Sequence, residues 1–327
     1  MKPAPAELTA LLPEPVARFV HEHPDDDLSH LSVSERRRYA LALADLTFLR
    51  YSRPAVAVGS VREVVMGEGS ASVRCRLYLP NDWQGGLHVH LHGGGFWAGT
   101  IDELVTDAIC RRRAVEGEVA VLAVDYRLAP ENPFPAGLED ALLVLDAALS
   151  TSQGIGHDPR NVSLGGVSAG GNLAAAATIE LGERARLLRV LLLEVPAVDL
   201  SPSALPDLAD RSTREEYEQL LALYLQGNAE PLDHRVSPLY ASDLTRFPYT
   251  YIRVSEFDAL RPGAERFAAR LRGAGVPVDE ECTAGALHGV LSLDRVWKPA
   301  QEWQARAGVL LRDVHTGPAA RERTVGS

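Results

Sequence analysis

A serine flanked by glycines, in Gly166-Val167-Ser168-Ala169-Gly170, is the segment whose residue types most directly indicate chemistry. In the G-x-S-x-G pattern the serine lies on a sharp turn between a strand and a helix, with its hydroxyl exposed. Upstream, the run His92-Gly93-Gly94-Gly95 lets backbone N–H groups approach an oxygen closely. Such N–H groups stabilise the oxyanion of a tetrahedral intermediate. Together the two segments predict acyl transfer through Ser168.

A serine hydroxyl is a weak nucleophile and needs a base that is itself oriented by an acid. On a turn of this kind the nucleophile precedes the acid, and the acid precedes the base. The candidate bases are therefore His234, His288 and His315. His234 lies in an insertion, and we expect His315, beyond the last helical pattern, to be exposed. We favour His288, because a loop after the last predicted strand returns to the catalytic edge of the sheet.

Two carboxylates follow the predicted strand 250–254 and are candidates for the acid, namely Glu256 and Asp258. Asp258 is favoured because it lies in the turn just before a helix that begins near Pro262. Glu256 remains an alternative, and its other interpretation is a partner for a basic group or for substrate.

The elements that must position these residues alternate between strand and helix from residue 86 onward. We predict strands at 87–91, 119–124, 162–165, 189–195, 250–254 and 276–283, and helices at 103–115, 136–149, 169–181, 263–272 and 291–312. This alternation predicts an α/β fold with a mostly parallel central sheet and helices on both faces. Before it come strands at 61–65 and 72–79, joined by a turn at 67–69.

Two regions outside this alternation are predicted to form a helical cap. Residues 1 to about 50 have helical spacing, with Ser32 or Ser34 as the cap of the second helix and Glu35 in its first turn. Residues 200–247 contain one helical pattern, at 214–225, and no strand. Because ligands bind at the carboxyl edge of such sheets, a cap from 1–50 and 200–247 would cover the site. We expect one domain over 1–327, with a frayed tail at 317–327.

Composition narrows the class of protein further. The net charge of −11 argues against binding to nucleic acid, which requires basic patches. The odd number of cysteines, far apart, favours buried free thiols over zinc or redox sites. Neither a secretory signal nor an apolar run of about 20 residues is visible, so we expect a cytoplasmic protein without a membrane partner. The arginine triplets 36–38 and 111–113 are interpreted as solvated helix faces.

Several residues near the motifs have two readings. His88, His90 and His92 alternate along a strand and raise the question of a metal site, but no carboxylate or cysteine accompanies them. We therefore expect neither metal nor cofactor. Trp97 either lines a substrate pocket or packs the glycine loop. Leu287 and Val290, on either side of the proposed base, are further candidates for the substrate pocket.

The motifs together resemble the hormone-sensitive lipase family of α/β-hydrolases, the bacterial family IV esterases, from about residue 50 to 312. The matching segments are His92–Phe96, Asp125–Glu131, Gly166–Gly171, Asp258–Leu260, His288–Gly289 and, after the second cap helix, His234–Leu239. The resemblance implies a triad of Ser168, Asp258 and His288. It also implies that the oxyanion donors are the N–H groups of Gly94, Gly95 and Ala169, and that His92 and Gly93 support the site structurally.

The chain departs from the family pattern at two positions. Val167 precedes the serine where the family usually has Asp, Glu or Thr, so a hydrogen bond beside the serine is lost. Pro262 stands where a further acidic residue is common, at a first helical turn that accepts proline. Neither change affects the triad, but both weaken any inference about substrate.

The resulting expectation is a serine carboxylic-ester hydrolase that acts on a small-molecule ester with a short, acetyl-like acyl group. One alternative is a tailoring deacetylase or acyltransferase of secondary metabolism that uses the same triad. Another alternative is a non-catalytic small-molecule receptor, which the filled triad positions disfavour. The sequence leaves open whether the protein is a homodimer.

Overall fold

A mixed β-sheet forms the centre of the molecule in a computed structural model that describes residues 10–22, 28, 30–69, 71–151, 154–202, 204 and 211–317. The strand order is β1-β2-β4-β3-β5-β6-β7-β8. The pairs β1–β2 and β2–β4 are antiparallel, and all pairs from β4 to β8 are parallel. The predicted mostly parallel sheet is confirmed. Its strands are β1 (Ser60–Glu68), β2 (Ala71–Leu79), β3 (Leu87–Leu91), β4 (Ala120–Val124), β5 (Val162–Val167), β6 (Leu188–Glu194), β7 (Thr250–Ser255) and β8 (Val278–Thr283).

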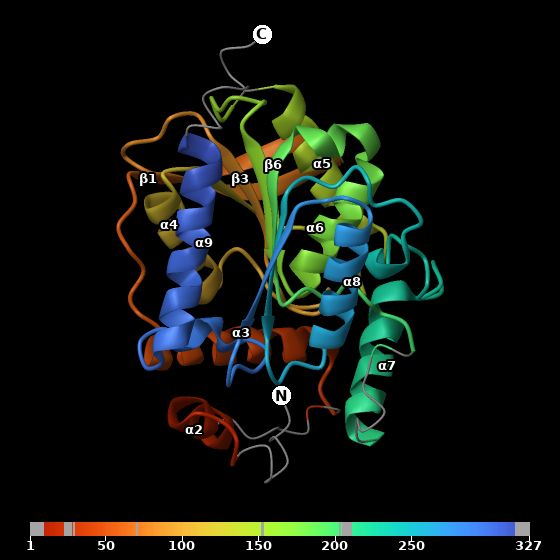
Figure 1. Cartoon of the computed structure of the whole chain (residues 1–327). Coiled ribbons are helices and arrows are strands. Elements are labelled where there is room, and N and C mark those ends of the chain that lie inside the picture. The colour runs from red at the N-terminus through yellow and green to blue at the C-terminus, as the bar shows by residue number, and fades with distance from the viewer. Residues whose placement is uncertain are drawn as a thin grey trace.

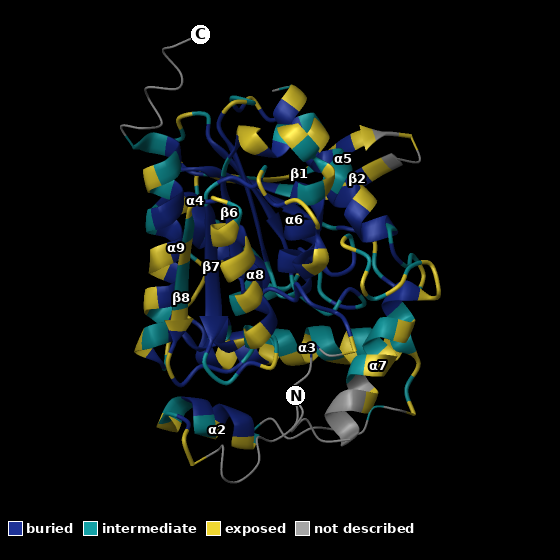
Figure 2. Ribbon diagram, turned by 45° about the vertical axis from the view of Figure 1, so that its right-hand side comes forward, coloured by how far each residue is buried: buried dark blue, intermediate teal, exposed yellow. Residues whose placement is uncertain are grey.

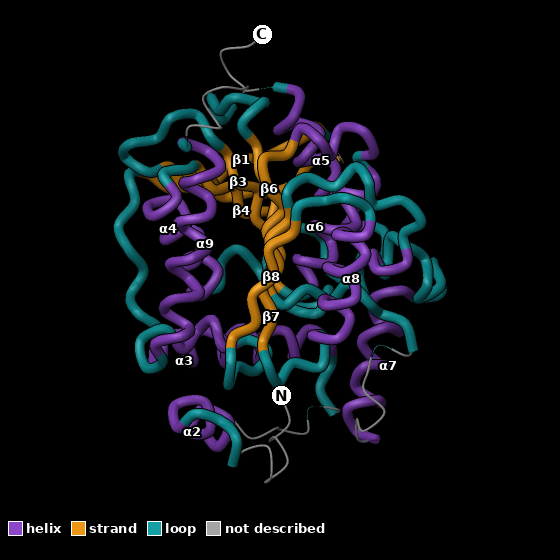
Figure 3. The backbone as a smooth tube through the Cα atoms, in the orientation of Figure 1, coloured by secondary structure: helices purple, strands orange, loops and turns teal. Residues whose placement is uncertain are grey.

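Helices cover both faces of the sheet (Figure 1, Figure 3). On one face α4 (Leu104–Gly117) packs against α9 (Lys298–Thr316), and the other face carries α5 (Ala136–Ser150), α6 (Ala169–Glu180) and α8 (Arg261–Gly273). Every residue of β3 and β4 is buried, as expected for parallel strands covered on both sides. The outer faces of α8 and α9 are exposed (Figure 2). The predicted layering is therefore confirmed.

Three further helices lie toward the carboxyl ends of the parallel strands. They are α2 (Glu14–Glu22), α3 (Val33–Tyr51) and α7 (Arg211–Leu225), and α3 crosses beneath the sheet (Figure 1). Ser32 begins α3 as predicted: its hydroxyl accepts from the Glu35 N–H and its own N–H donates to the Glu35 carboxylate. In the described part of 200–247 there is α7 and a short 3₁₀ helix, η2 (Pro238–Tyr240), but no strand. The predicted frayed tail lies outside the described residues, apart from Gly317.

The predicted final helix at 291–312 is wrong in its start and its end. A 3₁₀ helix η3 (Val290–Leu293) comes first, and α9 begins only at Lys298 and continues to Thr316. Pro299 lies in the first turn of α9, where its missing N–H costs nothing. Leu291 and Leu293 are buried in the 3₁₀ helix and its end. Their apolar spacing resembles that of a helix, so the sequence pattern joined them to α9. The β1–β2 turn is also shorter than predicted, because pairing continues to Glu68 and Ala71.

The interpretation of both arginine triplets as solvated faces is wrong. Arg113 is fully buried and donates to the Glu194 carboxylate, and Arg112 is buried against Asp294. These charges tolerate burial because each has a carboxylate partner. In the first triplet only Arg38 is exposed. The expectation of buried thiols holds for Cys75 and Cys110 but is wrong for Cys282, which is exposed on the edge strand β8.

Candidate active site

Ser168 stands at the turn between β5 and α6 in a strained conformation, with φ 56° and ψ −116°. Positive φ is unusual for a residue with a Cβ and is found at sites where the surroundings enforce it. Its N–H donates to the Glu194 carbonyl at 2.9 Å, which holds the turn against β6. A Cβ at Gly166 would meet the Gly170 carbonyl oxygen at 2.3 Å, and a Cβ at Gly170 would meet the Leu91 oxygen at 2.2 Å. Only glycine allows this close approach of the turn to the helix and to β3.

Ser168, His288 and Asp258 form a chain of hydrogen bonds. The Ser168 hydroxyl lies 2.9 Å from His288 Nε2, and His288 Nδ1 lies 2.8 Å from Asp258 Oδ2. The Asp258 side chain is only 2% exposed, whereas that of His288 is 39% exposed. Asp258 Oδ1 also accepts from the Leu260 N–H at 2.9 Å, which fixes the carboxylate in its turn. The ring is thus oriented by a buried carboxylate and is itself partly exposed.

The charge of Asp258 changes the proton affinity of His288. Burial lowers the pKa of His288, but the Asp258 charge and its hydrogen bond outweigh burial and raise the pKa above its ordinary value of 6.5. An opposite charge in contact favours the protonated ring. His288 is therefore prepared to hold a proton taken from Ser168.

Glu256, the alternative acid, has a different contact. Its carboxylate accepts from the Gly285 N–H at 2.7 Å, in the loop that precedes His288. A basic group also lies near it, because Arg261 Nη1 donates to the backbone carbonyl of Glu256 at 3.2 Å. Glu256 therefore holds the loop, while Asp258 alone of the two carboxylates contacts the His288 ring.

The two other candidate bases lie elsewhere. His234 is exposed and its Nε2 lies 3.3 Å from Glu180. The expected exposure of His315 is wrong: it is buried within α9, with Nε2 2.8 Å from the Ser163 hydroxyl and Nδ1 2.9 Å from the Asn161 amide oxygen. Burial lowers the pKa of His315 to about 3. This second serine–histidine pair has an amide where Asp258 stands in the first, and it lies inside the core.

The glycine loop lies directly beside Ser168. A Cβ at Gly93 would lie 3.6 Å from the Ser168 Cβ. Gly94 has φ 121° and its missing Cβ would meet the Ala98 oxygen at 2.1 Å, while its carbonyl accepts from the Trp97 and Ala98 N–H groups. Ala169 follows Ser168 at the first position of α6. The glycine loop and the first residue of α6 therefore both lie next to Ser168.

His92 lies under this loop. Its Nδ1–H donates to the Gly93 carbonyl at 2.7 Å, its ring stacks on Tyr126 at 4.3 Å, and the Tyr126 hydroxyl donates to the His92 carbonyl at 2.8 Å. Burial lowers the pKa of His92, so the ring stays neutral. These contacts of His92 and Tyr126 hold the glycine loop in position.

The neighbouring strand histidines have separate partners. His88 Nδ1 lies 2.9 Å from the Ser163 hydroxyl, and His90 Nδ1 accepts from Arg113 at 2.8 Å. Within the part of the chain that the structure describes, no three His, Cys, Asp or Glu side chains are grouped to hold a metal ion.

The proposed pocket residues differ in position. Trp97 is half-buried, lies beside Gly95 and is covered by the Arg36 guanidinium at 5.9 Å. Leu287 and Val290 are buried in an apolar cluster that also contains Val16, Phe19 and Val20 of α2. Val167, which replaces the usual polar residue, packs against the same cluster, and Pro262 lies in the first turn of α8 as expected.

Leu220 of α7 was missed by the sequence analysis. Its Cδ1 would lie 3.1 Å from a Cβ at Gly95, so α7 reaches over the glycine loop. Phe96 stacks on Tyr224, one turn further along the same helix, at 3.9 Å. The spacing of Tyr217, Leu220 and Tyr224 is the signal of an apolar helix face, but spacing does not reveal what that face covers.

Known proteins share this fold and these motifs. Residues 88–292 match a family described as having the alpha/beta hydrolase fold. The carboxylic ester hydrolase LipN of Mycobacterium tuberculosis is 35% identical over 240 residues, which cover 68% of this chain and 62% of LipN. The arylesterase of Saccharolobus solfataricus is 30% identical over 269 residues, which cover 79% of this chain and 84% of that enzyme.

Solved structures of other esterases have the same fold as this chain. The carboxylesterase EstE1 from a metagenomic library superposes with a TM-score of 0.79 at 29% identity, covering 88% of this chain and 99% of EstE1. A bacterial heroin esterase superposes with a TM-score of 0.81 at 26% identity, covering 94% and 99%. Fold and relatives define an α/β-hydrolase. Within that class the chain belongs to the hormone-sensitive lipase family, and it is a carboxylic ester hydrolase.

Among the described residues, no helix is both long enough and apolar enough to cross a bilayer.

Proposed function

We propose that this esterase hydrolyses esters with a short, acetyl-like acyl group through an acyl-enzyme on Ser168. The observation that carries the proposal is the unbroken hydrogen-bond chain from Ser168 through His288 to Asp258, with contacts of 2.9 and 2.8 Å. It lies against a glycine loop and ends on a buried carboxylate. This is the arrangement that serine acyl transfer requires.

In the proposed mechanism His288 Nε2 takes the Ser168 proton while Oγ attacks the ester carbonyl. Asp258 stabilises the imidazolium that forms. The N–H groups of Gly94, Gly95 and Ala169 donate to the oxyanion. His288 then gives its proton to the leaving alcohol and takes one from the water that attacks the acyl-enzyme. When the second tetrahedral intermediate collapses to the acid, His288 returns this proton to Ser168 Oγ.

Two observations support a short acyl group. Side-chain atoms of Leu220 and Trp97 lie 3.1 and 3.3 Å from the position of a Cβ on Gly95, which restricts the space beside the glycine loop. The ethyl acetate hydrolase of Pseudomonas putida is 30% identical over 240 residues, which cover 69% of this chain. The name of that enzyme specifies an acetyl ester.

The proposal includes a cap formed by residues 1–50 and 200–247 over a single α/β-hydrolase domain. It is supported by the position of α3 and α7 at the carboxyl edge of the sheet (Figure 1). It is also supported by contacts with the glycine loop from α7 through Leu220 and from α3 through Arg37, which donates to the Trp97 carbonyl at 2.7 Å.

The direct test is Ser168→Ala with p-nitrophenyl acetate, for which we expect kcat to fall by about 10⁴-fold or more. The matched control is Ser163→Ala, which removes the serine of the buried second pair and should leave most turnover in the folded enzyme. Substantial turnover by the Ser168 variant would contradict the assignment. In a series from acetate through butyrate and octanoate to laurate, kcat/KM should decline, and a rise would contradict the short-acyl part alone.

The same triad can transfer the acyl group to an alcohol or amine, as a tailoring deacetylase or acyltransferase would. Mass spectrometry of the products formed with competing nucleophiles separates this alternative from hydrolysis. A fluorophosphonate adduct on Ser168 would contradict a non-catalytic receptor.

A further inference from the structure

The middle arginine of the first triplet contacts the glycine loop. Arg37, on α3, donates from Nε to the Trp97 carbonyl at 2.7 Å and from Nη2 to the Ala129 carbonyl at 2.9 Å. The same guanidinium pairs with the Glu131 carboxylate at 2.8 Å. The planar fork of arginine suits several fixed acceptors at once, which a lysine cannot match. Arg37 thus ties α3 to the backbone immediately after Gly93–Gly95.

The carboxyl end of α3 is joined to the segment that follows His288. The Tyr51 carbonyl accepts from the Arg295 N–H at 3.0 Å, and the Ser52 hydroxyl donates to the Ser292 carbonyl at 2.6 Å. The Arg53 N–H donates to Asp294 Oδ1 at 2.8 Å. These bonds connect three consecutive residues, 51–53, to residues within 292–295, so the relative position of the two segments is fixed.

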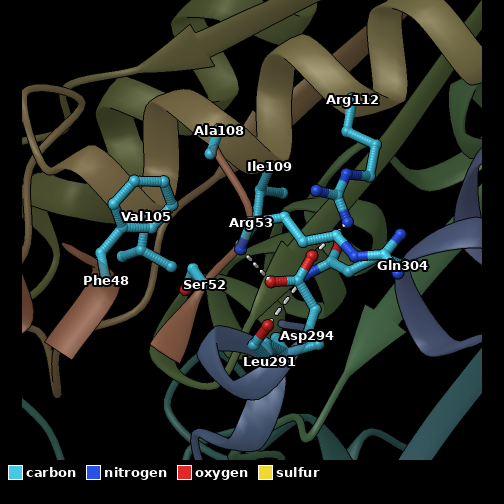
Figure 4. A pocket seen from close by; sticks show the side chains of 10 residues that line it. All are labelled: Phe48, Ser52, Arg53, Val105, Ala108, Ile109, Arg112, Leu291, Asp294 and Gln304. Carbon is cyan, nitrogen blue, oxygen red and sulfur yellow. Dashed lines mark hydrogen bonds and ion pairs between the residues drawn. The ribbon is translucent and has the colours of Figure 1, made fainter. Parts of the chain in front are cut away.

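The middle arginine of the second triplet strengthens this junction. Arg112 of α4 donates to Asp294, and the two side chains are 9% and 4% exposed. Figure 4 shows the Asp294 carboxylate between the backbone of Arg53 and the Arg112 side chain. Loss of one partner of a buried ion pair is costly because it leaves a charge without compensation.

The space beside the junction is too small for a ligand. The pocket lined by Phe48, Arg112 and Asp294 holds about 10 Å³, roughly the room that one water requires. A bound ligand therefore does not account for the charges of Arg112 and Asp294. Asp294 instead contacts the end of α3, and it lies in the segment that follows His288.

We propose that α3 is a brace that sets the glycine loop and the His288 segment at a fixed separation, with Arg37 and Asp294 as positioning residues at its two ends. The proposal rests on the roles proposed above for Ser168 and His288. Oxyanion donors and base act on the same tetrahedral centre from opposite sides. A displacement of about 1 Å between such groups can cost about 100-fold in rate, so a brace between them contributes to kcat.

The first test is Arg37→Lys with p-nitrophenyl acetate, measured well below the melting temperature of each variant. We expect kcat to fall about 10-fold with KM within about twofold, because lysine cannot hold all three acceptors. The pH at which kcat/KM falls on the acid side should stay unchanged, since His288 keeps its contact with Asp258. Arg38→Lys, at the exposed neighbour, is the matched control and should behave as the parent enzyme.

The second test is Asp294→Asn, which retains an acceptor for the Arg53 N–H but removes the charge opposite Arg112. We expect a similar fall in kcat and a shift of the acid limb to lower pH. The shift follows because a loosened His288 segment weakens the contact with Asp258, whose charge raises the pKa of His288. Asp313→Asn, at an exposed position of α9, is the control.

If the Asp294 variant does not fold, Ser52→Ala replaces it in the second test. This variant removes one neutral hydrogen bond of the junction and leaves the ion pair between Arg112 and Asp294 intact. Its kcat should fall about threefold, the size expected for a lost hydrogen bond of under about 1 kcal/mol. Parent-like kcat in the folded Arg37, Asp294 or Ser52 variants, with only a lower melting temperature, overturns the brace. Turnover by Ser168→Ala would instead overturn the proposed function, so the two failures are distinguishable.

Discussion

At the scale of single residues, the surroundings of a side chain decide its chemistry more than its type. Two of the serine–histidine contacts in the described residues differ in this way, Ser168–His288 and Ser163–His315. In the first, a buried carboxylate raises the pKa of the ring, whereas in the second, burial lowers it to about 3. Only the first is open to a substrate. A histidine that acts as a base toward a substrate therefore needs a neighbouring carboxylate and an exposed ring, and of these two histidines His288 has both.

The pH dependence of kcat/KM should report this difference. His288 acts as a base only when neutral, and its pKa is raised above 6.5. Activity should therefore be full at higher pH and fall as pH decreases through a midpoint above 6.5. Asp258→Asn should move that midpoint lower and reduce kcat by about 10⁴-fold, as expected when the ring loses its orienting carboxylate.

Glu256→Gln provides the comparison for this prediction. It alters the other carboxylate of the same turn, which contacts the Gly285 N–H and not the ring. The acid limb of the Glu256 variant should keep its position. A limb that moves with Glu256 and not with Asp258 would reverse the assignment of the acid.

At the scale of elements, the turns between strands and helices place the reacting groups. Ser168 leaves β5 with positive φ, and the glycine loop leaves β3 beside it. Because β3 and β5 are parallel neighbours, their carboxyl ends deliver both turns to one edge. The closest approaches occur at glycines, where a Cβ would overlap backbone atoms.

Gly94→Ala should therefore abolish most activity. The new Cβ would meet the Ala98 oxygen at 2.1 Å in a backbone with φ 121°, so the loop must move and its donors with it. We expect kcat to fall by at least the 10²- to 10³-fold that loss of one oxyanion donor costs.

The control for this prediction is Gly273→Ala, at the end of α8. Apart from its chain neighbours and its own helix backbone, a Cβ there would meet no atom within 4 Å, and the φ of Gly273 is not positive. This variant should keep parent kcat, and its free energy of unfolding should be unchanged or slightly raised. Equal loss of activity in both glycine variants would contradict the role of the loop.

At the scale of the whole molecule, a buried network around Glu194 joins α4 and α9 to the central sheet. Glu194, at the end of β6, accepts from Arg113 of α4 and from the Trp303 indole N–H of α9 at 2.8 Å. The backbone carbonyl of the same residue accepts from the Ser168 N–H. The layer of helices opposite α6 is thus connected by hydrogen bonds to the turn that bears the serine.

Arg113→Met should destabilise the fold strongly, because it leaves the Glu194 carboxylate buried without its cation. The expected loss is about 3–5 kcal/mol in the free energy of unfolding. Urea denaturation measures it as a lower midpoint. The double variant with Glu194→Gln should recover part of the loss, and a double variant less stable than Arg113→Met would contradict the argument.

Local patterns were sufficient to predict the succession of strands and helices along the chain, the serine turn and a cap for α3 at Ser32 or Ser34. These features depend on residues close together in sequence, because turn geometry, capping and periodicity are short-range properties. The candidate triad was predicted instead from the order of its members along the chain and from the family resemblance. The boundaries of the last helix were missed because buried apolar residues outside a helix imitate helical spacing.

Contacts between distant segments were decided only by the tertiary structure. The burial of Arg112, Arg113 and His315, the reach of Leu220 over Gly95 and the contact of Asp258 with His288 all depend on which segments meet. No spacing in the sequence encodes these neighbours, since a charge can be buried only where the fold supplies its partner. The chemistry was therefore predictable from the sequence, whereas the packing that aligns it required the assembled sheet and helices.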